Sequence, residues 1–147
     1  MLLSPISTHH LGLNGLSIAD QWLLSELYLQ VGRLNQSLQV AYEIFQQDSL
    51  QQQRYFLHQQ KVFRLGAEFA EEIGDYDSAA YYWSKVTQQQ PNDAEAWYGL
   101  GIAQANQQHY QDAQQSLQRS LQLNPNDQKA RSFLAEISVF TPGIPRR

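Results

Sequence analysis

Histidine and acidic side chains are the groups in this 147-residue chain that could do chemistry, because the chain contains no cysteine. Thiol catalysis and disulfide bonds are therefore excluded. His9 and His10 are adjacent and could begin a metal site, but the segment around them offers no further ligands to complete one. His58 follows two apolar residues, which favours a half-buried position, and His109 lies in a predicted turn. We predict neither a metal nor a cofactor.

Four carboxylates lie close together along the chain and could act as a general acid and base. Glu71 and Glu72 are at a predicted helix end, and Asp75 and Asp77 are at the start of the next helix. Acidic side chains are favoured at helix N-termini, so capping explains Asp75 or Asp77 better than acid–base catalysis. The sequence also has no glycine-rich phosphate loop. We predict that the protein is not an enzyme.

Charge and composition restrict the partners. The formal net charge is −4, and only 16% of the residues are charged. Without a basic footprint, binding to nucleic acid is not expected. No segment approaches the roughly 18–20 apolar residues that a membrane span needs. The N-terminus has neither the basic region nor the uninterrupted apolar run of a signal peptide. We expect a soluble, cytoplasmic protein.

A helix–turn–helix of about 34 residues, from Ala94 to Asp127, is the clearest structural pattern. Residues three and four apart share a helical face, and small residues at two of these positions let antiparallel helices approach closely. A proline near the end cannot continue the second helix. A generic helical hairpin is the alternative. The spaced positions are Trp97, Leu100, Gly101, Ala113, Leu117 and Pro125.

Two further repeats precede this one. Residues 60–93 have Phe63 in the tryptophan position and Trp83 in the second helix, and they end in QQQPND, close to the QLNPND of the next repeat. Residues 18–51 form a degenerate first repeat, with Gln21 in the tryptophan position unless Trp22 replaces it by a one-residue slip. Between these repeats, the absence of proline and glycine predicts one long helix over residues 50–73. A glutamine-rich loop is the alternative.

The remaining segments complete the predicted organisation. Residues 128–140 form one amphipathic helix, which we expect to cap the last repeat, so the helical domain spans residues 17–140. Residues 1–16 are predicted to be an irregular arm that packs through Leu11, Leu13 and Leu16. Residues 141–147 contain two prolines and a glycine and are expected to form a flexible tail.

With these motifs, residues 18–140 resemble a tetratricopeptide repeat protein. The resemblance implies an all-α fold, a right-handed superhelix (α-solenoid) of antiparallel helix pairs whose first helices line a concave groove. It also implies that the groove holds a peptide or helix of another protein. Fold alone does not fix function.

The resemblance places certain first-helix positions in the groove. Tyr98 and Ile102 would form an apolar patch flanked by charges, which suits a protein interface. Tyr98 could instead pack between repeats. The residues expected to contact a partner are Lys61, Arg64, Glu68, Tyr98, Ile102, Asn106, Lys129 and Ser132.

Some members of the family clamp a C-terminal carboxylate with lysine, asparagine and arginine. Arg64 and Lys129 stand at or near such positions, and Lys61 is basic too. Glu68 and Ile102 occupy positions where the clamp has asparagine, and Glu68 would repel a carboxylate. The clamp is therefore the weaker alternative. Secretion chaperones of similar length also carry three such repeats.

We predict a non-catalytic interaction module, an adaptor, assembly factor or chaperone that binds another protein. The alternative is a self-associating module in which the long helix and the surface rich in tyrosine and tryptophan form a homodimer.

Overall fold

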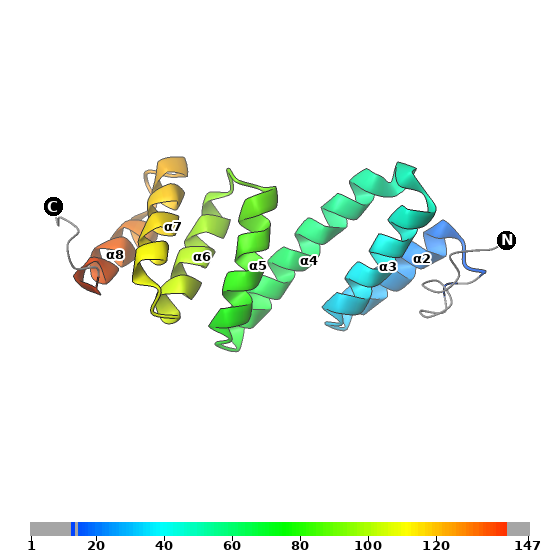
Figure 1. Ribbon diagram of the computed structural model, residues 1–147, viewed down its shortest axis with the longest axis horizontal. Coiled ribbons are helices and arrows are strands. Elements are labelled where there is room, and N and C mark those ends of the chain that lie inside the picture. Colours follow the sequence, from blue (N-terminus) through cyan, green and yellow to red (C-terminus); the bar gives the residue numbers. More distant parts are fainter. Residues whose placement is uncertain (1–12, 14, 141–147) are drawn as a thin grey trace. The chain divides into compact units, whose positions relative to one another are not determined.

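The computed structural model describes residue 13 and residues 15–140, and that part of the chain contains helices and turns but no strand. The predicted all-α class, with antiparallel helix pairs, is confirmed (Figure 1). The helices are α2 (Ile18–Gln30), α3 (Leu34–Gln47), η1 (Ser49–Gln51), α4 (Gln52–Glu72), α5 (Tyr76–Gln89), α6 (Ala94–Asn106), α7 (Tyr110–Leu123), α8 (Gln128–Ile137) and η2 (Ser138–Phe140).

The long helix expected over residues 50–73 is present as α4. It is preceded by η1, whose first amide is capped by the Asp48 carboxylate at 3.0 Å from the Leu50 nitrogen. The glutamine-rich loop considered as the alternative is wrong. The chain divides into two units, residues 1–62 and 63–147, and the boundary falls inside α4.

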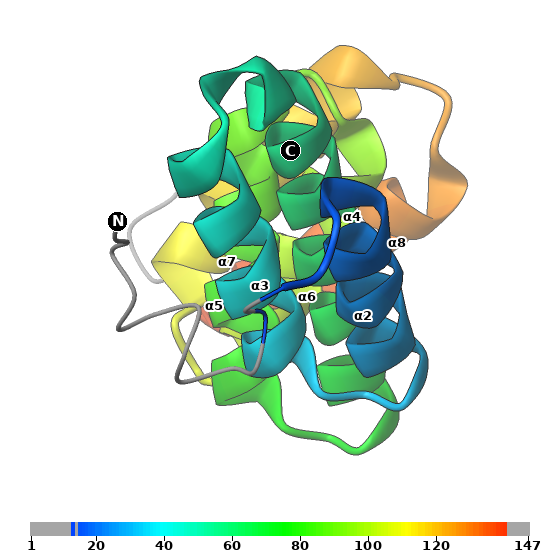
Figure 2. The same cartoon turned by 90° about the vertical axis from the view of Figure 1, so that its right-hand side faces the viewer.

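In the first unit, α2 and α3 pack as a pair (Figure 2). Their core contains Leu13, Trp22 and Ile44, so the predicted arm is anchored through Leu13. Leu16 is exposed, and Leu11 lies outside the described residues. Tyr55 of α4 joins this core by stacking on a phenylalanine of α3, with ring centroids 5.2 Å apart.

Both residues considered for the tryptophan position of the first repeat are buried. Trp22 fills the core, and its indole nitrogen donates to the Gln51 side chain at 3.0 Å. Gln21 bonds the backbone carbonyl of Leu16 and the side chain of Gln47 instead. A buried glutamine is tolerated here because its amide groups have partners.

The second unit stacks its helices in chain order, with α5 against α6, α6 against α7, and α7 against α8. Ala67, Ala79, Trp83 and Leu100 share one buried cluster. A second cluster contains Ala113, Leu117, Ala130 and Ile137. Since α8 supplies the last two of these residues, it covers the apolar face that α7 would otherwise expose.

Two glycines of α6 permit the closest helix contacts. A Cβ atom on Gly101 would lie 2.8 Å from Leu117 Cγ, which confirms the predicted need for a small residue there. A Cβ atom on Gly99 would lie only 2.5 Å from Trp83 Cε2, a contact that the motif did not identify. A bulky indole therefore packs directly on helix backbone, and close packing of this kind tolerates little added volume.

Side chains cap the starts of four helices. The side chains of Ser17, Asp75, Asp93 and Asp127 each accept a hydrogen bond from the backbone amide three residues later. Asp75, rather than Asp77, is therefore the cap of α5. Each such bond satisfies one of the amides that a helix N-terminus leaves without a partner.

The turns inside the three helix pairs share one backbone feature. Gly32, Gly74 and Gln108 occupy the same position of the predicted repeats, and their φ angles are +79°, +75° and +66°. Glycine adopts this left-handed conformation at little cost, whereas glutamine pays a steric penalty. The repeat boundaries remain our proposal, and the arm residues 1–12 and the tail 141–147 lie outside the described part.

We expect Gly99→Ala to lower the free energy of unfolding by about 1–2 kcal/mol, because overpacking outweighs the roughly 1 kcal/mol gained in helix propensity. Urea unfolding measures the change. In a Trp83→Phe background the smaller ring leaves room, so the same substitution should cost little. An equal loss in both backgrounds would refute the contact.

Gln108→Gly should raise the free energy of unfolding by about 0.5–1 kcal/mol, because it removes left-handed strain from a residue with a Cβ atom. Gly74→Gln, which introduces that strain at the equivalent turn, is the matched control and should lower stability by a similar amount. Thermal unfolding of the two variants gives the comparison. Stabilities that change in the same direction would contradict the equivalence of the turns.

Candidate functional site

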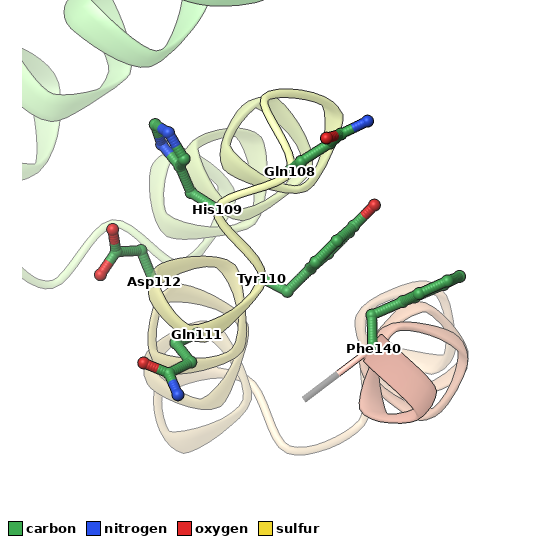
Figure 3. A pocket seen from close by; sticks show the side chains of 6 residues that line it. All are labelled: Gln108, His109, Tyr110, Gln111, Asp112 and Phe140. Carbon is green, nitrogen blue, oxygen red and sulfur yellow. The ribbon is translucent and has the colours of Figure 1, made fainter. Parts of the chain in front are cut away.

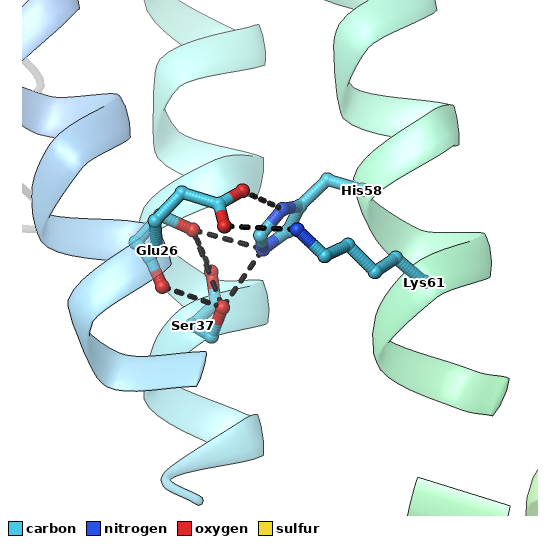
Figure 4. Close-up of polar contacts among 5 residues, drawn as sticks. Glu26, Ser37, His58 and Lys61 are labelled. Atoms are coloured by element: carbon cyan, nitrogen blue, oxygen red, sulfur yellow. Dashed lines mark hydrogen bonds and ion pairs between the residues drawn. The ribbon is translucent and has the colours of Figure 1, made fainter. Parts of the chain in front are cut away.

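The arrangement most like a catalytic site lies inside the first unit, around His58 (Figure 4). Its Nε2 atom is 2.8 Å from Ser37 Oγ and 3.0 Å from Ser25 Oγ. Its Nδ1 atom is 3.3 Å from Glu26 Oε1. A hydroxyl, an imidazole and a carboxylate in this order have the connectivity of a hydrolase triad.

Burial argues against catalysis at this cluster. Ser25 and Ser37 are fully buried, and His58 is only 5% exposed, more buried than the half-buried position predicted. The Ser25 hydroxyl donates to the Ser37 carbonyl, and the Ser37 hydroxyl to the Ser25 carbonyl, both at 2.8 Å. A nucleophile must reach its substrate, and these buried hydroxyls cannot. Their hydrogen bonds instead link α2, α3 and α4 through buried polar groups.

Electrostatics around His58 follows from burial and from one ion pair. Burial lowers the pKa of His58, the Glu26 carboxylate opposes this, and the charges of Lys61 and Arg54 lower it further. Burial alone would raise the pKa of Glu26, but its hydrogen bond to Lys61 and the nearby positive charges leave it below its ordinary value. Lys61 Nζ lies 3.0 Å from Glu26 Oε2.

The second histidine lies beside a shallow surface pocket at the turn between α6 and α7. His109 and Asp112 lie on one side of this turn, and Tyr110 and Phe140 lie on the other (Figure 3). The rings of Tyr110 and Phe140 stack with their centroids 4.8 Å apart. The side chains of the pocket do not converge on a common point, so the pocket offers no acid–base pair.

The carboxylates at the junction of α4 and α5 have separate structural tasks. Asp75 also accepts a hydrogen bond from the Ser78 hydroxyl at 2.6 Å, and Asp77 accepts one from Gln107 at 2.9 Å. Burial raises the pKa of Glu71, and the nearby carboxylates of Glu68 and Glu95 raise it further. Among the described residues, no group of three or more histidine or acidic side chains could hold a metal ion.

Arg64, one of the predicted partner-binding residues, already forms ion pairs with acidic side chains of its own chain. Its guanidinium pairs with Asp93 and with Glu95, the latter at 2.9 Å, and lies 5.5 Å from the centre of the Trp83 ring. Asp93 therefore caps α6 and binds Arg64 at the same time. Lys61 belongs to the first unit.

Tyr98 is half-buried and packs against the buried cluster formed by α6, α7 and α8. Burial raises the pKa of its hydroxyl, and the nearby carboxylates of Asp127 and Glu71 raise it further. Tyr98 thus packs between helices, as the alternative interpretation held, and keeps part of its ring at the surface. The structure brings α4, α6 and the start of α8 together at this residue.

The other predicted contact residues lie at the surface of the same unit. Ile102 is half-buried, and its carbonyl accepts a hydrogen bond from the Asn106 side chain at 2.9 Å. Glu68, Lys129 and Ser132 are exposed. Whether these residues contact a partner stays a prediction.

The buried cluster around His58 is the feature that sequence reasoning missed. Ser25 and Ser37 lie on the buried faces of α2 and α3. A serine at a core position is a signal for a hidden hydrogen-bond partner. That signal does not identify His58, because the partner comes from a separate helix further along the chain.

Part of the chain matches a known protein family and known relatives. Residues 72–137, from the end of α4 through α8, match a family model described as tetratricopeptide repeat. The PEX5-related proteins of Mus musculus and Homo sapiens are 36% identical to the chain over 93 residues. That match covers 59% of this chain and only 16% and 15% of the two relatives.

Solved structures show the same fold. The first tetratricopeptide domain of Spaghetti (RPAP3), bound to the HSP90 peptide SRMEEVD, aligns with a TM-score of 0.54 at 15% identity, covering 84% of this chain and 92% of that one. The C-terminal tetratricopeptide-containing domain of a Plasmodium falciparum FK506-binding protein aligns with a TM-score of 0.59 at 19% identity, covering 85% and 88%. In the part of the chain described by the structure, no helix is long and apolar enough to cross a membrane.

The His58 cluster predicts that stability falls in acid. The folded protein has a lower pKa for His58 and Glu26 than the unfolded chain, so the unfolded chain binds more protons below about pH 6.5. The contribution of His58 is complete above that pH and is lost as the pH falls. Urea unfolding at neutral and at mildly acidic pH measures the slope.

His58→Gln should flatten this slope between neutral and mildly acidic pH and should lower stability at neutral pH. His109→Gln, in an exposed turn, is the matched control and should keep the wild-type slope. Identical slopes for the wild-type protein and His58→Gln would show that the cluster does not govern the pH dependence.

Proposed function

The chain is a tetratricopeptide repeat protein, and from this we propose that it is a non-catalytic interaction module that holds a segment of another protein on its first-helix face. The related RPAP3 domain is bound to a peptide, which supports a protein partner for this chain. The buried serines around His58 support the absence of catalysis, because the triad-like arrangement that they form has no access to a substrate.

The observation that carries the proposal is a partly exposed apolar surface bordered by acidic side chains. Tyr98 and Ile102 keep part of their side chains at the surface, and Glu68 and Glu71 lie on the neighbouring first helix. The Tyr98 hydroxyl lies close enough to Glu71 and Asp127 for their charges to raise its pKa. Apolar groups within a polar rim are the composition of protein interfaces.

The negative charge beside this apolar surface favours a partner with basic residues. The positive charge of Arg64 is balanced by two carboxylates, Asp93 and Glu95, so it is not available to an acidic ligand. Glu68 leaves a negative charge on the same face. A segment with apolar anchors and flanking lysine or arginine therefore complements this surface.

This preference differs from that of the RPAP3 domain, whose HSP90 peptide SRMEEVD is acidic. In this chain a carboxylate would meet Glu68, and reaching Arg64 would require displacing Asp93 or Glu95. We therefore propose that the chain does not use the carboxylate clamp. Lys129, Ser132 and Asn106 complete the rim of the binding face in the second unit.

The cellular role that we propose is that of an adaptor, assembly factor or chaperone in the cytoplasm. This chain spans only about one sixth of the length of the PEX5-related proteins that it matches. Their complete activities therefore do not transfer. The solenoid architecture supports the role because stacked helix pairs present extended surfaces to a partner.

Labelled peptides test the charge preference. We expect peptides with leucine or phenylalanine anchors and flanking lysine or arginine to bind at least about tenfold tighter than SRMEEVD, a difference of roughly 1.4 kcal/mol. Fluorescence polarisation at two salt concentrations measures both affinity and screening. Equal or tighter binding of SRMEEVD would contradict the proposal.

Variants locate the binding face. Ile102→Ser should weaken the basic peptides about tenfold, and Glu68→Lys should reduce their advantage over SRMEEVD. Tyr81→Ala is the matched control, because it removes an exposed ring from α5, the second helix of its repeat, which is not part of the proposed binding face. Thermal unfolding confirms that each variant is folded. Affinities that respond to Tyr81→Ala but not to Ile102→Ser would place the binding face elsewhere.

A further inference from the structure

The outer face of α2 and the C-cap residue that follows it carry three exposed apolar side chains. Leu23, Leu27 and Val31 are 57%, 48% and 68% exposed, and their spacing of four residues places them along one side of the helix. The opposite side of α2 is buried, with Trp22 and Leu29 packed inside the first unit. A helix that is apolar on both sides is typical of one covered by neighbours on both sides.

The third repeat shows what covers this face. With the repeats aligned as proposed, Leu23 and Leu27 of α2 correspond to Gly99 and Ala103 of α6. Gly99 packs beneath Trp83 of α5, and Ala103 is fully buried. The face is therefore the one on which a preceding helix packs. In α2 the same positions carry large apolar residues that remain uncovered by the described part of the chain.

We propose that this α2 surface, formed by Leu23, Leu27 and Val31, is the contact between two copies of the chain. Two α2 helices would pair antiparallel about a two-fold axis, with Leu27 facing Leu27 of the second copy. Leu23 would then face Val31 of the second copy. The three positions are symmetric about Leu27, so one surface can pair with itself, which is the commonest form of closed homodimer.

Charge at the two ends of the surface supports this arrangement. Asp20 lies one turn before Leu23, and Arg33 lies just beyond Val31, outside the helix. Both residues are exposed, and neither makes an ion pair within residues 15–140. Antiparallel pairing would bring Asp20 close to Arg33 of the second copy at both ends. Parallel pairing would instead place like charges together.

The surface of α8 is a poorer contact for a second copy. A head-to-tail contact would need an apolar surface on α8, but the exposed side chains of this helix are mostly polar. The exposed side chains of α8 are Gln128, Lys129, Arg131, Ser132, Ala135 and Glu136.

A second apolar row lies on α4 and just after it, where Leu65, Phe69 and Ile73 are 40%, 52% and 70% exposed. Glu68 and Glu72 border this row. Antiparallel pairing of α4 with itself would gather carboxylates from both copies along one edge, and this repulsion favours α2 as the contact.

Sedimentation equilibrium of the full chain over a range of concentrations tests the proposal. We expect a reversible dimer, and Leu27→Glu should raise its dissociation constant at least about tenfold because two carboxylates would meet at the centre. Phe69→Glu makes the same change on α4 and should leave the dissociation constant unchanged. A wild-type chain that is monomeric throughout, or a dimer that only Phe69→Glu disrupts, would overturn the proposal.

Charge exchange tests the orientation. Asp20→Arg and Arg33→Asp should each weaken the dimer, and the double variant should restore it. The absence of cysteine allows a second test, in which Leu27→Cys alone should form an intermolecular disulfide under oxidation and Phe69→Cys should not. Failure of the double variant to restore dimerisation would refute the antiparallel pairing.

Thermal unfolding distinguishes a contact between copies from a contact within one chain. If the chain is monomeric and Leu27→Glu lowers its unfolding temperature, the face is covered by its own chain, and the proposal is wrong. These outcomes do not depend on peptide binding, because α2 and the proposed partner face on α4, α6 and α8 are probed by different variants.

Discussion

Direct contact between bulky side chains and helix backbone is the constraint on which the second unit depends. Trp83 packs on Gly99, and Leu117 packs on Gly101, at distances that leave no space for a methyl group. These contacts set the separation of α5 from α6 and of α6 from α7. The clusters that contain Ala79, Ala113 and Ala130 can close only because these helices lie so near one another.

The first unit is organised differently, around hydrogen bonds in its interior. Ser25, Ser37 and His58 come from three helices and form hydrogen bonds with one another. Each would be costly to bury alone, so the three helices must keep the register in which all the groups are paired. Glu26 and Lys61 extend the network to the surface. Fixed polar geometry thus replaces some of the close packing found in the second unit.

The sequence predicted most of the fold, because local signals determine most of the helices. The spacing of Trp97, Leu100 and Gly101 predicted α6, and the start of α5 was predicted from the capping residues Asp75 or Asp77. The uninterrupted helical pattern after Leu50 predicted α4 as one long helix. Such signals lie within a few residues of the structure they specify.

The site was less predictable, because its contacts join distant parts of the chain. Arg64 was assigned to a ligand, yet its position opposite Asp93 and Glu95 results from the packing of α4 on α6. His58 was expected to be half-buried. Its deeper burial was not predictable, because the two serines that enclose it lie on other helices. Periodicity identifies which side of a helix is apolar, but it does not say whether another element covers that side, as Leu23 and Leu27 show.

The continuity of α4 has a consequence for how the chain folds. Starting a helix is the unfavourable step, whereas adding residues to an existing one costs far less. Because the boundary between the units falls within α4, whichever unit folds first supplies a ready-made nucleus from which the helix can elongate past Val62 into the other. Gly66, a weak helix former only four residues further on, is then the natural place for that elongation to pause.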